Sequence, residues 1–330
     1  MGNNVMFSVL CGMLCAKGRD EALLDHGTEE VRQAFSRMMP KSDAIDAYFE
    51  VPLIGKRGID VICSLGKPVR KEQVPEAVDG AWSAALAWFS DIAPMKTEKG
   101  NVQLLAEMDL VSGMASRLGT YLIQCDRADL VGPYLAVVGE AAWLSAWESF
   151  CTRLPRGWET TYVGLFPGRG DNLLRVNAHP AHDGAVGFTE ALSHLGLAAN
   201  EEAIALCRSV LDSSSGFDLQ LDVDDGGRPV ADFALEARLE GKLLSMSPWE
   251  DGRAQRVFSL MEESGAADGR WSTLEQVDIS KQLLLPTPDG LQTCSMSLRT
   301  YSAKVRFTSG RPALAKAYLR GEALSSAKFT

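Results

Sequence analysis

The sequence has few cysteines and none of the cysteine patterns that mark a metal site or a disulfide framework. Its seven cysteines are an odd number in 330 residues, with no CxxC pair and no paired spacing of the zinc-ribbon kind. Disulfide-stabilised domains and zinc modules both depend on such pairs. We therefore expect reduced, mostly buried thiols in a chain that works in the cytoplasm.

Positive charge is also scarce. The formal net charge is -10 at pH 7, with 33 Lys and Arg residues against 43 Asp and Glu residues. Proteins that bind nucleic acid through overall basicity need clustered positive charge, because contacts with phosphates supply much of the affinity. No nucleic-acid partner is expected, although a local basic pocket is compatible with this composition.

Histidine and the common catalytic motifs are nearly absent. There are four histidines, no GxSxG elbow, no Walker lysine followed by Ser or Thr, and no GxGxxG before a helix. These absences argue against a serine hydrolase and against a nucleotide-binding domain. His179 and His182 are close in sequence, but Pro180 lies between them and no third ligand is evident, which favours a loop over a metal site.

No apolar run is long enough to cross a bilayer. The most apolar stretch, 5–15, is shorter than the roughly 20 residues that a spanning helix needs. It also lacks the basic segment that begins a secretory signal. We interpret this stretch as a buried helix and expect no membrane partner.

The sequence is rich in strand pairs with one apolar and one polar face. In the segment 298–320, the first arm sets Tyr301, Ala303, Val305 and Phe307 against Ser302, Lys304, Arg306 and Thr308. Turn-forming residues follow at 309–312, and the second arm alternates alanines with Lys316 and Tyr318. Two interpretations are open. The charges lie in water on a surface hairpin, or the basic face points into a cavity that holds an anion.

The hairpin pattern recurs along the chain, which we interpret as a single domain over 1–330. Hairpins are predicted near 45–65, 102–125, 159–178, 217–240 and 298–320, with helical periodicity between them. Their turns centre on Lys56, Gly113, Gly168, Asp225 and Gly310, at intervals of 57, 55, 57 and 85 residues. Near-equal intervals indicate an internal repeat of helices followed by a hairpin. Five hairpins predict ten antiparallel strands.

The polar strand faces favour closure of these strands into a barrel. Ten strands with an outer layer of helices can stay open, with the polar face in water, or close and remove both edges. Closure would gather the polar-face residues in one lumen wide enough for a ligand. Separate sheets with solvated basic faces, in an ordinary α+β protein, are the remaining alternative.

Three short segments resemble the ABBA aromatic prenyltransferases. Phe49-Glu50-Val51 is similar to the first strand of the indole-prenylating and cyanobactin branches, which carries an acidic residue. Gly58-Ile59-Asp60 resembles the acid-bearing start of the second strand in the small bacterial branch. Lys316-Ala317-Tyr318-Leu319 resembles the family's basic-x-Tyr strands. The resemblance implies an α+β fold, a ten-stranded antiparallel barrel of five repeated ααββ units with helices outside.

The resemblance also implies a reaction, the transfer of an allylic group from a prenyl diphosphate to an aromatic acceptor, either a small molecule or a peptide side chain. Ionisation of the diphosphate needs fixed cations at one end and electron-rich faces that exclude water. The implied diphosphate-binding residues are Arg175, Arg238, Lys304, Arg306 and Lys316, and the implied cation shield is Tyr48, Tyr121, Tyr162 and Tyr318. Glu50 would be the catalytic residue that orients or deprotonates the acceptor.

The resemblance requires no metal, and the sequence has no DDxxD motif. Mg²⁺ remains an option, with Asp60 as its ligand. We expect a monomer. The alternative function is a non-catalytic barrel that binds a peptide or a small anion as a partner in natural-product maturation.

Overall fold

The computed structural model describes most of the chain between its termini. The described residues are 3–14, 31–33, 35, 38, 44–65, 80–92, 96–97, 100–108, 110, 118–124, 127–166, 173–182, 184–240, 247–287 and 290–325. The predicted turn centres Gly113 and Gly168 lie outside these residues.

The core of the fold is a closed barrel of ten antiparallel strands, which confirms the predicted fold class. In barrel order the strands are β1 (Ala44–Pro52), β2 (Asp60–Leu65), β5 (Gln103–Met108), β6 (Gly119–Ile123), β7 (Trp158–Leu165), β8 (Leu174–Pro180), β9 (Gly216–Val223), β10 (Pro229–Arg238), β12 (Gly290–Thr308) and β13 (Arg311–Ser325). The pairing of β10 with β12, from Phe233 opposite Phe307 to Arg238 opposite Ser302, closes the barrel. Closure leaves none of these ten strands with an open edge inside the barrel wall.

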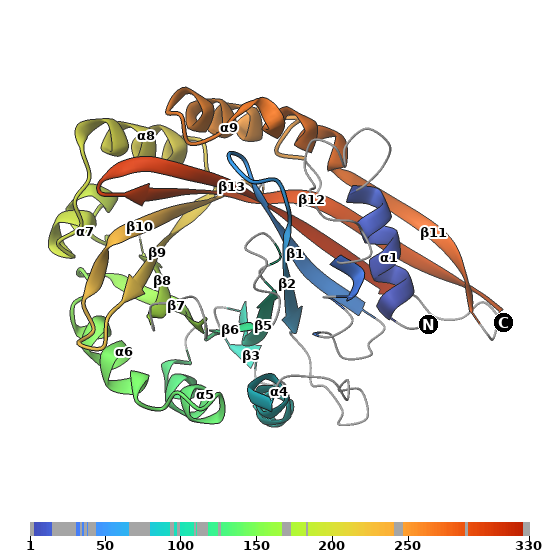
Figure 1. Cartoon of the computed structure of the whole chain (residues 1–330), viewed down its shortest axis with the longest axis horizontal. Coiled ribbons are helices and arrows are strands. Elements are labelled where there is room, and N and C mark those ends of the chain that lie inside the picture. The colour runs from blue at the N-terminus through green and yellow to red at the C-terminus, as the bar shows by residue number, and fades with distance from the viewer. Residues whose placement is uncertain are drawn as a thin grey trace.

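Helices cover the outside of the barrel (Figure 1). They are α1 (Asn3–Leu14), α4 (Gly80–Ile92), α5 (Val131–Val137), α6 (Trp143–Thr152), α7 (Phe188–His194), α8 (Glu201–Asp212) and α9 (Arg253–Glu263), with short 3₁₀ helices η2 (Ala128–Leu130) and η3 (Gly269–Val277). The apolar face of each strand packs against this layer: Leu219, Leu221 and Val223 of β9, for example, are fully buried. The alternate residues therefore point into the barrel. No helix among the described residues is long and apolar enough to span a membrane.

An eleventh strand, β11 (Ile279–Thr287), lies outside the barrel and was not predicted. It pairs only with the first half of β12, Gly290 to Leu298, and this ribbon extends to one side of the barrel (Figure 1). β12 therefore begins well before the predicted start of the last hairpin. A short separate ribbon is formed by β3 (Lys96–Thr97) and β4 (Gly100–Asn101).

The turn between β12 and β13 needs a left-handed backbone. Ser309 and Gly310 have φ values of 51° and 74°, and Thr308 and Arg311 face each other across the turn. Two central residues with positive φ form the turn whose twist matches that of the flanking strands. The turn and a register shift between Arg306 and Phe307 together place Lys304 opposite Lys316.

Candidate active site

The polar strand faces enclose a cavity of about 370 Å³ inside the barrel. Every one of the ten barrel strands contributes to its wall. The lining residues are Tyr48, Ile62, Leu105, Glu107, Tyr121, Ile123, Thr161, Tyr162, Asn177, Asp218, Gln220, Glu236, Arg238, Tyr301, Lys304 and Tyr318. Such a mixture of aromatic, aliphatic and few charged groups is typical of a small-molecule site.

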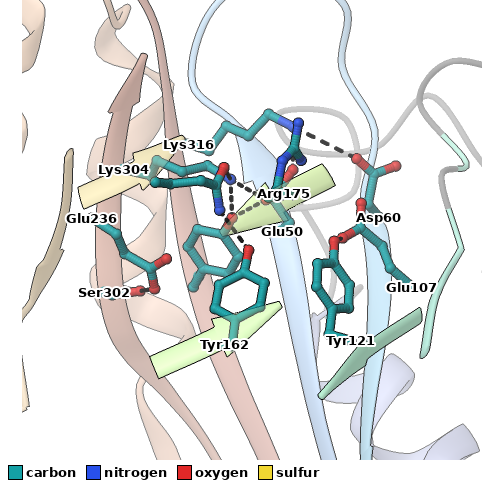
Figure 2. Close-up of polar contacts among 12 residues, drawn as sticks. Glu50, Asp60, Glu107, Tyr121, Tyr162, Arg175, Glu236, Ser302, Lys304 and Lys316 are labelled. Atoms are coloured by element: carbon teal, nitrogen blue, oxygen red, sulfur yellow. Dashed lines mark hydrogen bonds and ion pairs between the residues drawn. The ribbon is translucent and has the colours of Figure 1, made fainter. Parts of the chain in front are cut away.

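Glu50 lies at the centre of a buried ionic cluster at one side of this cavity (Figure 2). Its Oε2 accepts a hydrogen bond from Lys304 Nζ at 2.9 Å, and its carboxylate also accepts from Lys316 and from the Tyr318 hydroxyl. Lys316 Nζ is 3.8 Å from Asp60 Oδ2. Strand register explains the cluster, because Glu50 is opposite both Asp60 and Tyr318.

The cluster strongly favours the charged form of Glu50. Burial disfavours the carboxylate, but the charges of Lys304 and Lys316 outweigh burial and hold the pKa of Glu50 well below its usual value. The two lysines differ. Burial lowers the pKa of Lys304, whereas at Lys316 the carboxylates of Glu50 and Asp60 outweigh burial and raise the pKa. Lys316 is therefore the more firmly charged of the pair.

Arg175 of β8 is a neighbouring cation, whose charge helps to lower the pKa of Lys304. Its Nε and NH2 bond the two oxygens of Asp222 at 2.8 and 3.1 Å, and its guanidinium lies 4.5 Å from the ring centre of Phe166. Burial opposes the charge, but Asp222 outweighs burial and raises the pKa of Arg175. In Figure 2, Lys304 and Lys316 reach Glu50, and Arg175 comes from β8.

The other two predicted cations lie apart from this group. Arg238 lines the cavity, but 40% of its side chain is exposed and it bonds Asp218 Oδ2 through NH2 at 2.7 Å. Arg306 is 46% exposed and bonds Asp232 at 3.2 Å. Arg306 does not line the main cavity, but it lines a small separate cavity together with Arg175 and Asp222.

All four predicted tyrosines line the cavity. Tyr121 and Tyr162 meet edge to face with ring centres 5.1 Å apart. Burial raises the pKa of Tyr48 and Tyr162, so both remain neutral phenols. Their rings provide electron-rich surfaces at the cavity wall.

A fifth tyrosine, Tyr301, also lines the cavity and was not predicted. Simple alternation puts Tyr301 on the outer face of β12, but the pairing of β12 with β13 shifts between Thr300 and Ser302. This bulge turns Tyr301 inward, where its ring centre is 5.2 Å from that of Tyr48. No sequence signal for a bulge is evident at this position.

The cavity also contains carboxylates to which the sequence interpretation gave no role. Tyr121 donates a hydrogen bond to Glu107, and Asp218 and Glu236 lie on adjacent strands, directly opposite each other. The sequence signal that could have identified these carboxylates is their position on the polar face of each alternating strand pattern. Among the described residues, Glu50, Asp60 and Glu107 are close enough for each to supply one oxygen to a metal ion. Carboxylate oxygens suit Mg²⁺, so this donor set is compatible with the optional metal.

Comparison with known proteins gives a match in structure only. No protein-family model matches the chain, and no curated protein matches it. The apo form of the prenyltransferase PriB matches with a TM-score of 0.52 and 16% identity, over 96% of this chain and 95% of that one. The 5-dimethylallyltryptophan synthase from Streptomyces coelicolor matches with a TM-score of 0.52 and 12% identity, over 96% and 95% of the two chains.

At these identities the likeness is one of fold, and it extends over nearly the whole of both chains. It agrees with the closed ten-stranded barrel and its outer helices. The chain has the ten-stranded barrel fold of the ABBA prenyltransferases.

Proposed function

We propose that this chain is an aromatic prenyltransferase, which moves an allylic group from a prenyl diphosphate to an aromatic acceptor. The observation that carries the proposal is that Lys304 and the four predicted tyrosines line one cavity, with Lys316 beside Lys304 at Glu50 and Arg175 close enough to lower the pKa of Lys304. On an open sheet whose polar face lies in solvent, these side chains would not face a shared ligand-binding cavity. The acceptor is a small molecule or a peptide side chain, and the chain acts as a cytoplasmic monomer.

The three buried cations would stabilise the leaving group. Breaking the bond between the allylic carbon and its oxygen leaves both bonding electrons on the diphosphate and a positive charge on the prenyl carbon. Fixed cations in a dry site stabilise such developing negative charge without reorganisation. Lys304 already has a cation–π contact, with Nζ 4.9 Å from the ring centre of Tyr318. The diphosphate would therefore lie beside the tyrosine faces.

The tyrosine rings would shield the allylic cation until the acceptor attacks. Tyr121, Tyr162 and Tyr318 line the cavity, and Tyr318 contacts Lys304. Their π faces attract a cation, and their bulk excludes the water that would otherwise capture it. The acceptor ring forms the new bond to carbon and then loses a proton.

Glu50 would accept that proton. Without substrate its carboxylate is the counterion of Lys304 and Lys316, which makes it a weak base. A diphosphate carries more negative charge than one carboxylate and would compete for both lysines. Substrate binding would thereby raise the proton affinity of Glu50 at the stage when a base is needed.

The proposal does not require Mg²⁺. Where the ion assists, Asp60 would hold it together with Glu50 and Glu107, and it would supply additional positive charge to the diphosphate. The other steps use the side chains of the chain itself.

The test is incubation with dimethylallyl, geranyl or farnesyl diphosphate and indole-bearing acceptors, with and without EDTA, followed by mass spectrometry. A product heavier by the prenyl group is expected with at least one diphosphate. Glu50→Gln should reduce transfer while leaving diphosphate binding measurable. If Glu50→Gln transfers as fast as the parent chain, the role of Glu50 is wrong.

The alternative, a barrel that binds an anion or a peptide without catalysis, is favoured by one observation. Arg175, Lys304 and Lys316 are all paired with carboxylates. Pairing lowers the net positive charge available to a diphosphate. Diphosphate binding without turnover in the same assay would support this alternative.

A further inference from the structure

Glu236 is a carboxyl group with unmet hydrogen-bonding capacity at the cavity wall. It lies on β10, and its only side-chain hydrogen bond within the described residues is the one that Oε1 accepts from Ser302 Oγ at 2.8 Å. It forms no ion pair there. The two cations whose charges act on it, Lys304 and Arg238, are bonded to other carboxylates. Glu236 is half-buried at the cavity wall, so a donor inside the cavity can add to its one hydrogen bond.

Asn177 of β8 shows the same deficit independently. It is only 4% exposed and lines the same cavity, and its Oδ1 has no hydrogen-bond donor within the part of the chain that the structure describes. An unpaired buried acceptor costs free energy. Two separate acceptors facing one cavity indicate a ligand that brings N–H or O–H donors.

The charges around the cavity favour a cationic donor. The two cations in the wall are already bonded to carboxylates: Arg238 to Asp218, and Lys304 to Glu50. Tyr48, Tyr301 and Tyr162 add aromatic faces near the same wall. A carboxylate among tyrosine rings is the combination that recognises an organic ammonium group.

We propose that the cavity binds an aromatic amine whose ammonium group pairs with Glu236 and whose ring N–H reaches Asn177. The proposal rests on the proposed function for the ligand's role as acceptor, but not for its binding. β8 and β10 are two strand spacings apart, roughly 10 Å, and inward side chains shorten that distance. An arylalkylamine spans such a gap. A ligand with a free carboxylate is disfavoured, because the wall offers it no unpaired cation among the described residues.

The test compares tryptamine, tryptophol and tryptophan by isothermal titration calorimetry, without diphosphate. Tryptophol replaces the ammonium by a neutral hydroxyl, and tryptophan adds a carboxylate. Tryptamine is expected to bind most tightly. In Glu236→Gln its Kd should rise about 10-fold to 100-fold, as loss of a charge-assisted hydrogen bond implies, while the Kd of tryptophol stays the same.

Glu240→Gln is the matched control. It removes a carboxyl group two positions beyond β10 and outside the cavity wall, so tryptamine binding should be unchanged. Thermal unfolding of both variants verifies that they fold. Equal Kd values for tryptamine in the parent chain and in Glu236→Gln overturn the proposal, as does tighter binding of tryptophan than of tryptamine.

Prenyl transfer to the same three compounds is measured separately. Amine-selective binding that depends on Glu236 supports the inference even where no transfer occurs, in which case the proposed function fails alone. Transfer to all three at similar rates, with no binding preference, overturns the inference and leaves the proposed function intact.

Discussion

At the scale of single residues, the buried carboxyl groups of the barrel fall into two electrostatic classes. Glu50 has two lysines as partners, and its pKa is held well below the usual value. Glu236 has Ser302 as its one hydrogen-bond partner, and burial raises its pKa. The two glutamates therefore have opposite protonation tendencies. Glu50 on β1 is suited to balance the fixed charge of the lysines, and Glu236 on β10 is suited to change its protonation when a ligand binds.

Glu50→Gln should destabilise the ligand-free protein at neutral pH. The substitution leaves Lys304 and Lys316 buried beside an uncharged amide, and removing one partner of a buried ion pair typically costs about 3–5 kcal/mol. Urea unfolding at pH 7 measures the loss. Glu322→Gln is the control, because Glu322 is half exposed in its pair with Arg320 and should contribute about 0–1 kcal/mol. Equal losses of stability in the two variants would contradict the prediction that the Glu50 ion pairs stabilise the folded protein.

Glu236→Gln should change the pH dependence of stability. Because the folded pKa of Glu236 is raised, the folded state retains a proton that the unfolded chain releases as pH rises. Stability from this group is fully present below the usual Glu pKa of about 4.3 and is lost as pH rises through the raised value. Lys304, Asp218 and Arg238 are the charges that face it.

The parent chain and Glu236→Gln should therefore unfold at similar urea concentrations near about pH 4, and the variant should gain relative stability towards neutral pH. Denaturation series at several pH values measure the difference. A constant offset at all pH values would show that Glu236 does not titrate between these limits in the folded protein.

At the scale of strands, alternation was enough to predict which residues point into the barrel, but not which of them touch. Glu50 and Lys304 are 254 positions apart, and their contact depends on the stagger of β1, β13 and β12. Stagger in a barrel is set by closure of all ten strands, which no local pattern reports. Tyr301 was missed for a related reason, since a bulge between Thr300 and Ser302 interrupts the alternation at this residue.

A glycine on β7 makes room for one of the cavity tyrosines. Gly164 is opposite Tyr121, and a Cβ at Gly164 would come within 2.3 Å of Tyr121 Cδ1. Gly164→Ala should displace the Tyr121 ring and weaken its bond to Glu107, at a cost of about 1–3 kcal/mol for overpacking. Thermal unfolding measures the stability, and near-ultraviolet circular dichroism reports the ring.

Gly216→Ala on β9 is the matched control for Gly164→Ala. Its Cβ would meet only Arg238 side-chain atoms at 3.8 Å, which is ordinary van der Waals contact. The exchange should be neutral or slightly stabilising, because alanine restricts the unfolded chain. If both alanine variants lose the same stability, the loss comes from replacing any strand glycine and not from a clash with the Tyr121 ring.

At the scale of the whole molecule, the repeat of hairpins predicted the barrel, whereas the ribbon beyond it was unexpected. β11 has an apolar centre, Leu283 to Leu285, that gave no alternation to mark it as a strand. Its partner segment of β12 continues past the barrel wall. The long interval before the last turn is explained by this insertion, because β11 and the early part of β12 occupy chain that the other repeats lack.

The barrel and the ribbon should respond differently to loss of an apolar side chain. Phe307 is fully buried and stacks on Phe233, with ring centres 4.7 Å apart, across the β10–β12 seam that closes the barrel. Phe307→Ala removes this contact from the seam and should cost about 3–5 kcal/mol. Leu284 of β11 is 62% exposed, so Leu284→Ala should change stability by less than about 0.5 kcal/mol.

Urea unfolding gives both values, and titration with tryptamine reports whether the cavity persists. If the seam holds the chamber shut, Phe307→Ala should weaken tryptamine binding as well as stability, because opening β10 from β12 separates Glu236 from Ser302. Leu284→Ala should leave both unchanged. Loss of binding in Leu284→Ala with binding retained in Phe307→Ala would place the ligand on the ribbon and not in the barrel.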